Sequence, residues 1–125
     1  MSIEVTRTIE AAPAAAWRLL TEPSQWPSWG PSVRAVACDD ERLRTGTSGR
    51  VQTPLGVWVP FEVTEVDPGH RWTWRVARIP ATGHRVEPGA RGCRVVFEVP
   101  TWGLGYVPVC ELALRRIERR LTARG

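Results

Sequence analysis

The stretch from Gly105 to Arg124 constrains the fold most, because it is the one long stretch with helical periodicity. Its apolar residues recur at spacings of four, three and four: Cys110, Leu114, Ile117 and Leu121. This spacing places them on one stripe of an α-helix, and Pro108 suits the first turn, where its missing N–H costs no hydrogen bond. The helix must bury that stripe, and nearly everything upstream is expected to form strands. We therefore predict that a curved sheet packs around this helix.

The upstream residues alternate between apolar and polar side chains with a period of two, which is typical of strands with one buried face. Strands are expected at residues 2–11, 32–38, 46–53, 57–66, 71–79, 82–87 and 93–100. Pro13 opens one short helix, which ends before Pro23 because the residue preceding a proline avoids the helical region. Short turns join the strands, so we predict an antiparallel meander in an α+β fold.

The segment 23–31 holds three prolines, one glycine and two tryptophans, and we expect it to be irregular and stiff. A tryptophan in such a segment is costly unless its ring is buried. We therefore interpret Trp26 and Trp29 as a lid or plug at one end of the core.

Length and composition predict one domain covering residues 1–125. No apolar run reaches the ~18 residues that suggest a membrane span, and the first residues lack the basic and apolar regions of a secretory signal. The three cysteines, Cys38, Cys93 and Cys110, are widely spaced and form no metal-binding pattern. We expect a cytoplasmic protein with no membrane span, no metal and no cofactor, since phosphate-binding and dinucleotide motifs do not occur either.

The net charge of +4 raises the question of nucleic acid. All 17 basic residues are arginines, and most are scattered among acidic residues. Arginines concentrate only in the C-terminal helix, where they also complement the helix dipole. We therefore predict no nucleic-acid partner, and the absence of lysine excludes Schiff-base chemistry by a side chain.

Several segments together carry a resemblance to a known family: 3–13 followed by 16–20, then 25–31, 61–72, 92–97 and the terminal amphipathic helix. In their order and spacing they resemble the Bet v 1-like, START-type superfamily, and within it the bacterial polyketide cyclase/dehydrase-like group. The resemblance covers essentially the whole chain. It implies a helix-grip fold, in which a seven-stranded antiparallel sheet wraps around the C-terminal helix and leaves a hydrophobic cavity between them.

The resemblance also implies binding of lipids, polyketides or other apolar molecules, and in some members cyclisation or dehydration of polyketides. It supplies no catalytic motif to transfer. Strand phase and position suggest these ligand-binding residues: Trp26, Trp29, Phe61, Trp72, Trp74, His84, Phe97, Trp102, Tyr106, Cys110 and Leu114. The alternative is that the aromatic side chains simply fill the core of a small protein.

Two residues are weak catalytic candidates. His84 shares the apolar phase of its strand and could act as a general acid or base, or be a hydrogen-bonded wall residue. Arg75 could hold a carboxylate or an enolate oxygen, or form a cross-strand ion pair on the solvated face. Trp58 is out of phase with its apolar neighbours, so it is expected to face outward and to mark a partner surface or a dimer interface.

Three functions remain open. The first is a carrier or sensor that binds a small hydrophobic, aromatic or polyketide-like molecule, as a monomer or homodimer. The second is an aromatase/cyclase or dehydratase that acts by proton transfers. The third is a protein-interaction module whose cavity is filled by its own tryptophans. The volume between helix and sheet discriminates them. A void below the ~300 Å³ typical of small-molecule pockets favours the third function, and a large void with no ionisable lining favours the first.

Overall fold

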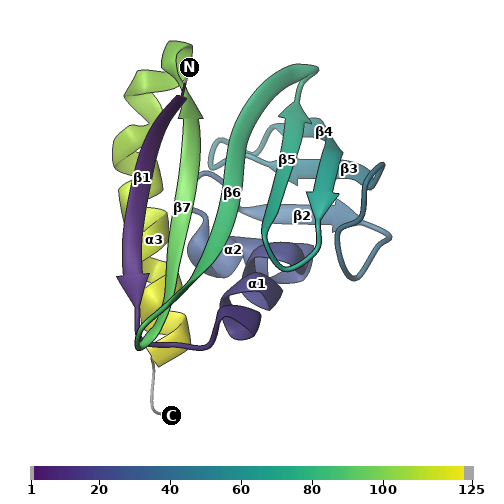
Figure 1. Ribbon diagram of the computed structural model, residues 1–125. Coiled ribbons are helices and arrows are strands. Elements are labelled where there is room, and N and C mark those ends of the chain that lie inside the picture. The colour runs from purple at the N-terminus through teal and green to yellow at the C-terminus, as the bar shows by residue number, and fades with distance from the viewer. Residues whose placement is uncertain (1, 123–125) are drawn as a thin grey trace.

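The computed structural model describes residues 2–122 (Figure 1). Its strands are β1 (Ser2–Ile9), β2 (Ala35–Cys38), β3 (Ser48–Gln52), β4 (Trp58–Asp67), β5 (Arg71–Val76), β6 (Ile79–Gly89) and β7 (Gly92–Pro100). Its helices are α1 (Pro13–Thr21), α2 (Trp26–Trp29) and α3 (Val107–Thr122), with 3₁₀ turns η1 (Pro23–Gln25) and η2 (Thr101–Tyr106). Within residues 2–122 the strands form one antiparallel seven-stranded sheet in the order β1-β7-β6-β5-β4-β3-β2. The predicted α+β architecture is confirmed.

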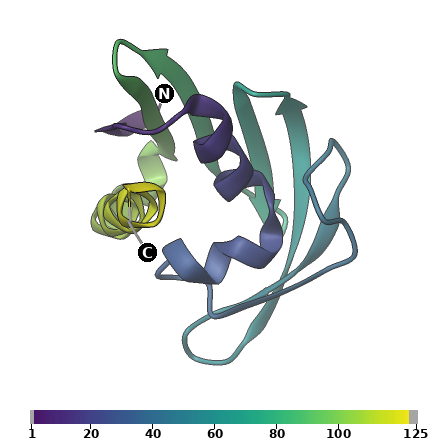
Figure 2. The same ribbon diagram turned by 90° about the horizontal axis from the view of Figure 1, so that it is seen from below.

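Helix α3 packs into the curve of the sheet as the periodicity predicted. Cys110, Ala113, Leu114 and Ile117 are its buried residues. Figure 2 shows α3 end-on, with α1 and α2 inside the same curve. An ion pair ties the helix to the edge strand, because Arg7 of β1 lies 2.7 Å from the Glu118 carboxylate. The last predicted helical residues, Ala123 and Arg124, lie outside the described range.

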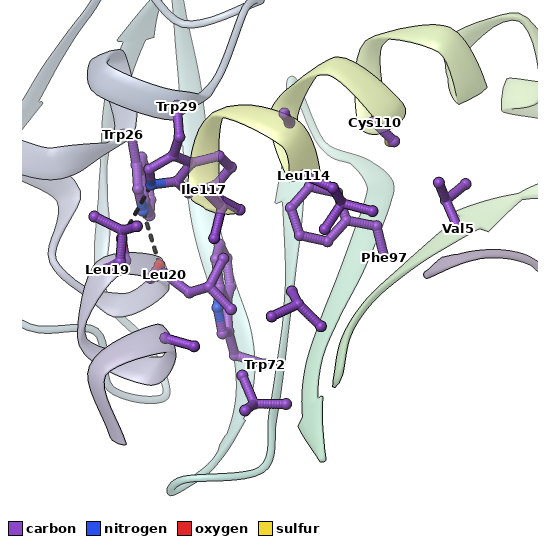
Figure 3. Close-up of a cluster of buried hydrophobic side chains, with 14 of the residues drawn as sticks. Val5, Leu19, Leu20, Trp26, Trp29, Trp72, Phe97, Cys110, Leu114 and Ile117 are labelled. Carbon is purple, nitrogen blue, oxygen red and sulfur yellow. Dashed lines mark hydrogen bonds between the residues drawn. The ribbon is translucent and has the colours of Figure 1, made fainter. Parts of the chain in front are cut away.

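The segment 23–31 differs from the prediction, because η1 and α2 form consecutive helical turns instead of an irregular loop. Each of its two indoles caps a carbonyl of α1. Trp26 Nε1–H donates to Leu20 O over 2.9 Å, and Trp29 Nε1–H donates to Leu19 O over 3.0 Å (Figure 3). Both rings are buried, at 1% and 6% exposure. They plug the core, and the lid interpretation was wrong.

The turn between β5 and β6 lies at other residues than expected. Residues 71–79 were expected as one strand, but β5 ends at Val76 and the chain turns at Ala77 and Arg78. Both residues have positive φ, 52° and 67°, which is unusual without glycine or asparagine. Strand β6 is consequently 11 residues long, from Ile79, where only residues 82–87 were expected.

The convex face of the sheet, which points away from α3, carries an ion-pair network centred on Glu98 of β7. Its carboxylate accepts from Arg71 over 2.6 Å and from Arg85 over 2.7 Å. Val96 lies on the same strand and was expected to face outward, yet it is almost fully buried without joining the main core cluster. Its strand partner on β6 is Arg85. We attribute its burial to the apolar stems of the arginines that cross this face.

Candidate functional site

An apolar pocket of about 280 Å³, the outer pocket, lies where the ends of the central strands meet η2. Its walls come from β3 to β7, the loop before β2, and η2. The lining residues are Ser32, Val33, Val51, Thr53, Val59, Trp74, Val76, Ala81, Thr82, Val99, Pro100, Trp102, Gly103 and Tyr106. None of these described lining residues is charged. An uncharged, mostly hydrocarbon wall favours an uncharged, mostly apolar ligand.

A second space of about 40 Å³, the inner chamber, lies deeper between sheet and α3. Its walls include Trp26, Trp29, Trp72, Trp74, Thr82, His84, Phe97, Tyr106, Cys110 and Ala113. Aromatic rings occupy most of this region. Trp26 lies parallel to Trp72 with ring centroids 5.6 Å apart, and the edge of Trp74 meets Trp26 at 5.2 Å. The tryptophans therefore reduce the space beneath the helix to little more than the room of a water molecule.

The outer pocket and the inner chamber share part of their walls. The residues common to both are Ser32, Val33, Trp74, Thr82 and Tyr106. Across this boundary the hydroxyls of Ser32 and Tyr106 form a hydrogen bond. Burial raises the pKa of Tyr106, so its hydroxyl stays protonated at neutral pH. The Ser32–Tyr106 bond thus joins the loop before β2 to η2 at the narrow part of the site.

A chain of three polar groups borders the same boundary. Trp74 Nε1–H donates to Thr82 Oγ1 over 3.2 Å, and Thr82 Oγ1 lies 3.0 Å from His84 Nε2. His84 is 3% exposed, and burial lowers its pKa to about 3. The imidazole is therefore neutral at physiological pH. Among the described residues, His84 Nδ1 and Trp72 Nε1 have no partner in hydrogen-bonding geometry.

The structure separates the predicted ligand-binding residues into three groups. The inner chamber is bordered by Trp26, Trp29, Trp72, Trp74, His84, Phe97, Tyr106 and Cys110. The outer pocket is bordered by Trp74, Trp102 and Tyr106. Phe61 and Leu114 border neither space and belong to the packed core. The predicted set therefore describes the tryptophan-filled interior better than the larger outer pocket.

Arg75 does not face either space. Its side chain is more than half exposed and lies 3.9 Å from Glu62, as the ion-pair alternative expected. Trp58 is 42% exposed, and the guanidinium of Arg50 lies 5.8 Å from its ring centroid. The outward direction of Trp58 is confirmed, while a partner at this surface stays a prediction.

Sequence reasoning missed most of the outer pocket. Its aliphatic walls, such as Val51, Val59 and Val76, were not among the predicted ligand-binding residues. Thr82 was missed although a signal existed, because it lies two positions before His84 and therefore shares its side of β6. No group of three or more potential metal-ligating side chains gathers anywhere in residues 2–122.

The family model described as polyketide cyclase / dehydrase and lipid transport matches residues 1–123. The chain belongs to this family. No curated protein sequence matches it significantly. Family and fold together indicate a ligand-binding or polyketide-processing role. None of the described helices is long and apolar enough to cross a membrane.

Solved structures share the fold at low sequence identity. Protein MLL2253 of Mesorhizobium loti has a TM-score of 0.80 at 18% identity, covering 100% of this chain and 99% of its own. Protein SSP2350 of Staphylococcus saprophyticus has a TM-score of 0.79 at 13% identity, covering 98% and 93%. DynU16, a protein of the dynemicin biosynthetic locus, has a TM-score of 0.72 at 20% identity, covering 98% of this chain and 47% of its own.

Proposed function

We propose that this family member binds a small hydrophobic molecule, aromatic or polyketide-like, in the outer pocket. The observation that carries the proposal is the combination of about 280 Å³ of space with a lining that includes six aliphatic side chains and no charge among the described residues. Its volume lies just below the range usual for small-molecule pockets, ~300–1,000 Å³, so the proposed ligand is small. The indoles of Trp74 and Trp102 and the ring of Tyr106 favour an aromatic one.

The proposal is binding rather than catalysis, because neither catalytic candidate suits proton transfer in this site. A histidine with a pKa of about 3 is a weak base near neutral pH, and His84 is nearly sealed from solvent. Arg75 lies on the convex face with Glu62. Cyclisation or dehydration would need a different residue within hydrogen-bonding reach of the substrate.

One observation favours the interaction module as a second candidate. The inner chamber holds only about 40 Å³, because Trp26 and Trp72 fill the region beneath the helix. That candidate requires the outer pocket to remain empty in function. The two candidates therefore differ in a measurable way, which is whether a small apolar probe binds at Trp74 and Trp102.

The proposal includes a single domain that acts in the cytoplasm as a monomer or homodimer. Cys38, Cys93 and Cys110 are all free thiols, and two of them are buried, which supports a reducing compartment.

Titration with naphthalene, followed by the indole N–H signals in a proton–nitrogen NMR spectrum, tests the proposal. We expect the signals of Trp74 and Trp102 to shift with saturation, while that of Trp58 stays unchanged. Val76→Trp fills the pocket and should abolish the shifts. Thr6→Trp, which adds the same ring at an exposed position of β1, should leave them intact.

Saturable shifts that survive in Val76→Trp would place the probe elsewhere. An absence of any binding, with a normal spectrum, would contradict the proposal and favour the interaction module. Native mass spectrometry of protein purified from its own host would then identify a ligand that stays bound during purification.

A further inference from the structure

We propose that the ligand of the outer pocket carries a hydroxyl group that hydrogen-bonds to Thr82, and that Trp74 and His84 hold the Thr82 hydroxyl in position for it. This inference rests on the proposed function and makes it more specific: the ligand class is an uncharged phenol or aromatic alcohol.

Thr82 has the position that such a contact needs. Its side chain borders both the outer pocket and the inner chamber, at the junction of the two. The residue is only 8% exposed, so a ligand group that reaches it is removed from water. A hydrogen bond formed there is worth more than one at the exposed rim, where water competes.

Two neighbours fix the Thr82 oxygen. Trp74 Nε1–H donates to it over 3.2 Å from β5, and His84 Nε2 lies 3.0 Å away on the same strand. His84 is itself held by stacking on Trp72, with ring centroids 3.9 Å apart. Because His84 is buried and Trp74 is partly buried against the core, the hydroxyl is oriented before a ligand arrives, and its ordering costs the bound state little.

The remaining hydrogen-bonding capacity of Thr82 selects the ligand group. A hydroxyl offers one donor and two acceptor positions, and Trp74 uses one acceptor position. If Thr82 donates to His84 Nε2, one lone pair is left to accept from the ligand. If His84 Nε2–H donates to Thr82, the threonine O–H is left to donate. A ligand hydroxyl satisfies both arrangements, because it both donates and accepts.

A charged ligand group does not fit the same place. No described residue that lines the outer pocket is charged, and Arg71 of β5 and Arg85 of β6 are bonded to Glu98 on the convex face. A carboxylate moved from water into this environment would lose its hydration without gaining a cation. The aromatic side chains Trp74, Trp102 and Tyr106 then favour a hydroxyl attached to an aromatic ring.

Three probes with the same ring system test the hydroxyl contact and the exclusion of a charged group: naphthalene, 2-naphthol and 2-naphthoate. Each is titrated at pH 7 by isothermal titration calorimetry. We expect 2-naphthol to bind about 5- to 10-fold more tightly than naphthalene, as one buried hydrogen bond predicts. 2-Naphthoate should bind more weakly than either. Thr82→Val, which keeps the shape of the side chain, should bring 2-naphthol to the affinity of naphthalene. Thr82→Ser should retain the preference.

Thr73→Val is the matched control, because Thr73 lies on the neighbouring strand and bonds to Thr64 on the convex face. It should leave the preference for 2-naphthol unchanged. Equal affinities of 2-naphthol and naphthalene for the unmodified protein, or a preference that survives in Thr82→Val, would overturn the inference and leave the proposed function intact. Tighter binding of 2-naphthoate would overturn it as well. Failure of all three probes to bind would instead count against the proposed function.

Discussion

The imidazole of His84 lies nearly parallel to the indole of Trp72, with ring centroids 3.9 Å apart and planes inclined by 18°. The two residues are register partners on β6 and β5, so the sheet itself places one ring on the other. Trp26 covers the far face of Trp72 at 5.6 Å. This stack excludes water from the imidazole and is the physical reason for its neutral state.

The buried imidazole predicts a dependence of stability on pH. Burial lowers the pKa of His84 from 6.5 to about 3, so the unfolded chain binds a proton in a range where the folded protein does not. The contribution of the neutral His84 to the free energy of unfolding is therefore fully present above about pH 6.5, and it is lost as the pH falls towards 3. The free energy of unfolding should drop by up to about 1.4 kcal/mol per pH unit, measured by urea denaturation between pH 6.5 and 5.

His84→Gln should flatten the pH profile within this range, because it removes the buried imidazole. An unchanged slope in His84→Gln would show that another group causes the acid sensitivity.

The Glu98 network predicts a contrast between a shielded and an exposed ion pair. The Glu98 side chain is 12% exposed and bonded to two arginines, and the bond from Arg71 is the main cause of its lowered pKa. Glu98→Gln should reduce the free energy of unfolding at pH 7 by about 1.5–3 kcal/mol. Glu62→Gln breaks only the exposed pair with Arg75 and should cost less than about 1 kcal/mol.

The dependence of stability on pH in the acidic range gives a second test of the role of Glu98. A lowered carboxyl pKa means that its stabilisation is present above about pH 4.5 and disappears as the pH falls below it. The difference between the unmodified protein and Glu98→Gln should therefore shrink in denaturation curves at lower pH. A difference that is constant with pH would mean that packing, and not charge, is responsible.

Gly92 at the start of β7 should be the glycine least tolerant of a side chain. A Cβ there would collide with the backbone oxygen of Ile9 and lie 2.8 Å from the backbone nitrogen of Ala11. Gly92→Ala should reduce the free energy of unfolding by about 1–3 kcal/mol, because backbone atoms must shift. Gly105→Ala, where a Cβ would meet open space, should change it by less than about 0.5 kcal/mol. If thermal or urea unfolding showed the same loss of stability for Gly92→Ala and Gly105→Ala, the close approach of the Ile9 and Ala11 backbone to Gly92 would be contradicted.

The Ser32–Tyr106 bond should govern how fast a probe enters the site. Either Ser32→Ala or Tyr106→Phe removes this bond between the loop and η2. We expect each to speed naphthalene exchange about fivefold, measured by NMR line shapes, since one hydrogen bond of about 1 kcal/mol is lost. The double variant should match the single ones, because both remove the same interaction. Additive effects would show that the two hydroxyls act separately.

The sequence supported the architecture because burial and periodicity determine it locally. The stripe from Cys110 to Ile117 and the alternation in β1 each require one buried face, and both were predicted at the correct positions. The turn between β5 and β6 was predicted at the wrong position, because Ala77 and Arg78 adopt positive φ without the residues that usually favour it. There the pairing of the long flanking strands determines the turn.

The candidate site was predicted less well than the fold, because strand phase shows which side a residue faces and not how space is divided. Trp26 and Trp72 share the apolar side with Trp74, but only Trp74 reaches the outer pocket. The stacking that closes the interior depends on where α2 places Trp26, and sequence periodicity contains no such distance. Trp102, also among the predicted ligand-binding residues, borders the outer pocket and is 67% exposed.

The sheet and helix α2 contribute different parts of the site, and this has a consequence for how the fold can diversify. The strands supply most of the walls of the outer pocket, whereas α2 supplies Trp26, which packs against Trp72 in the interior. Under the proposed function, the length of the ligand would be limited by a short, separately replaceable piece of chain. Descendants of such a scaffold can acquire longer or shorter ligands by exchanging side chains in α2, while the strand pairing that guides folding stays as it is.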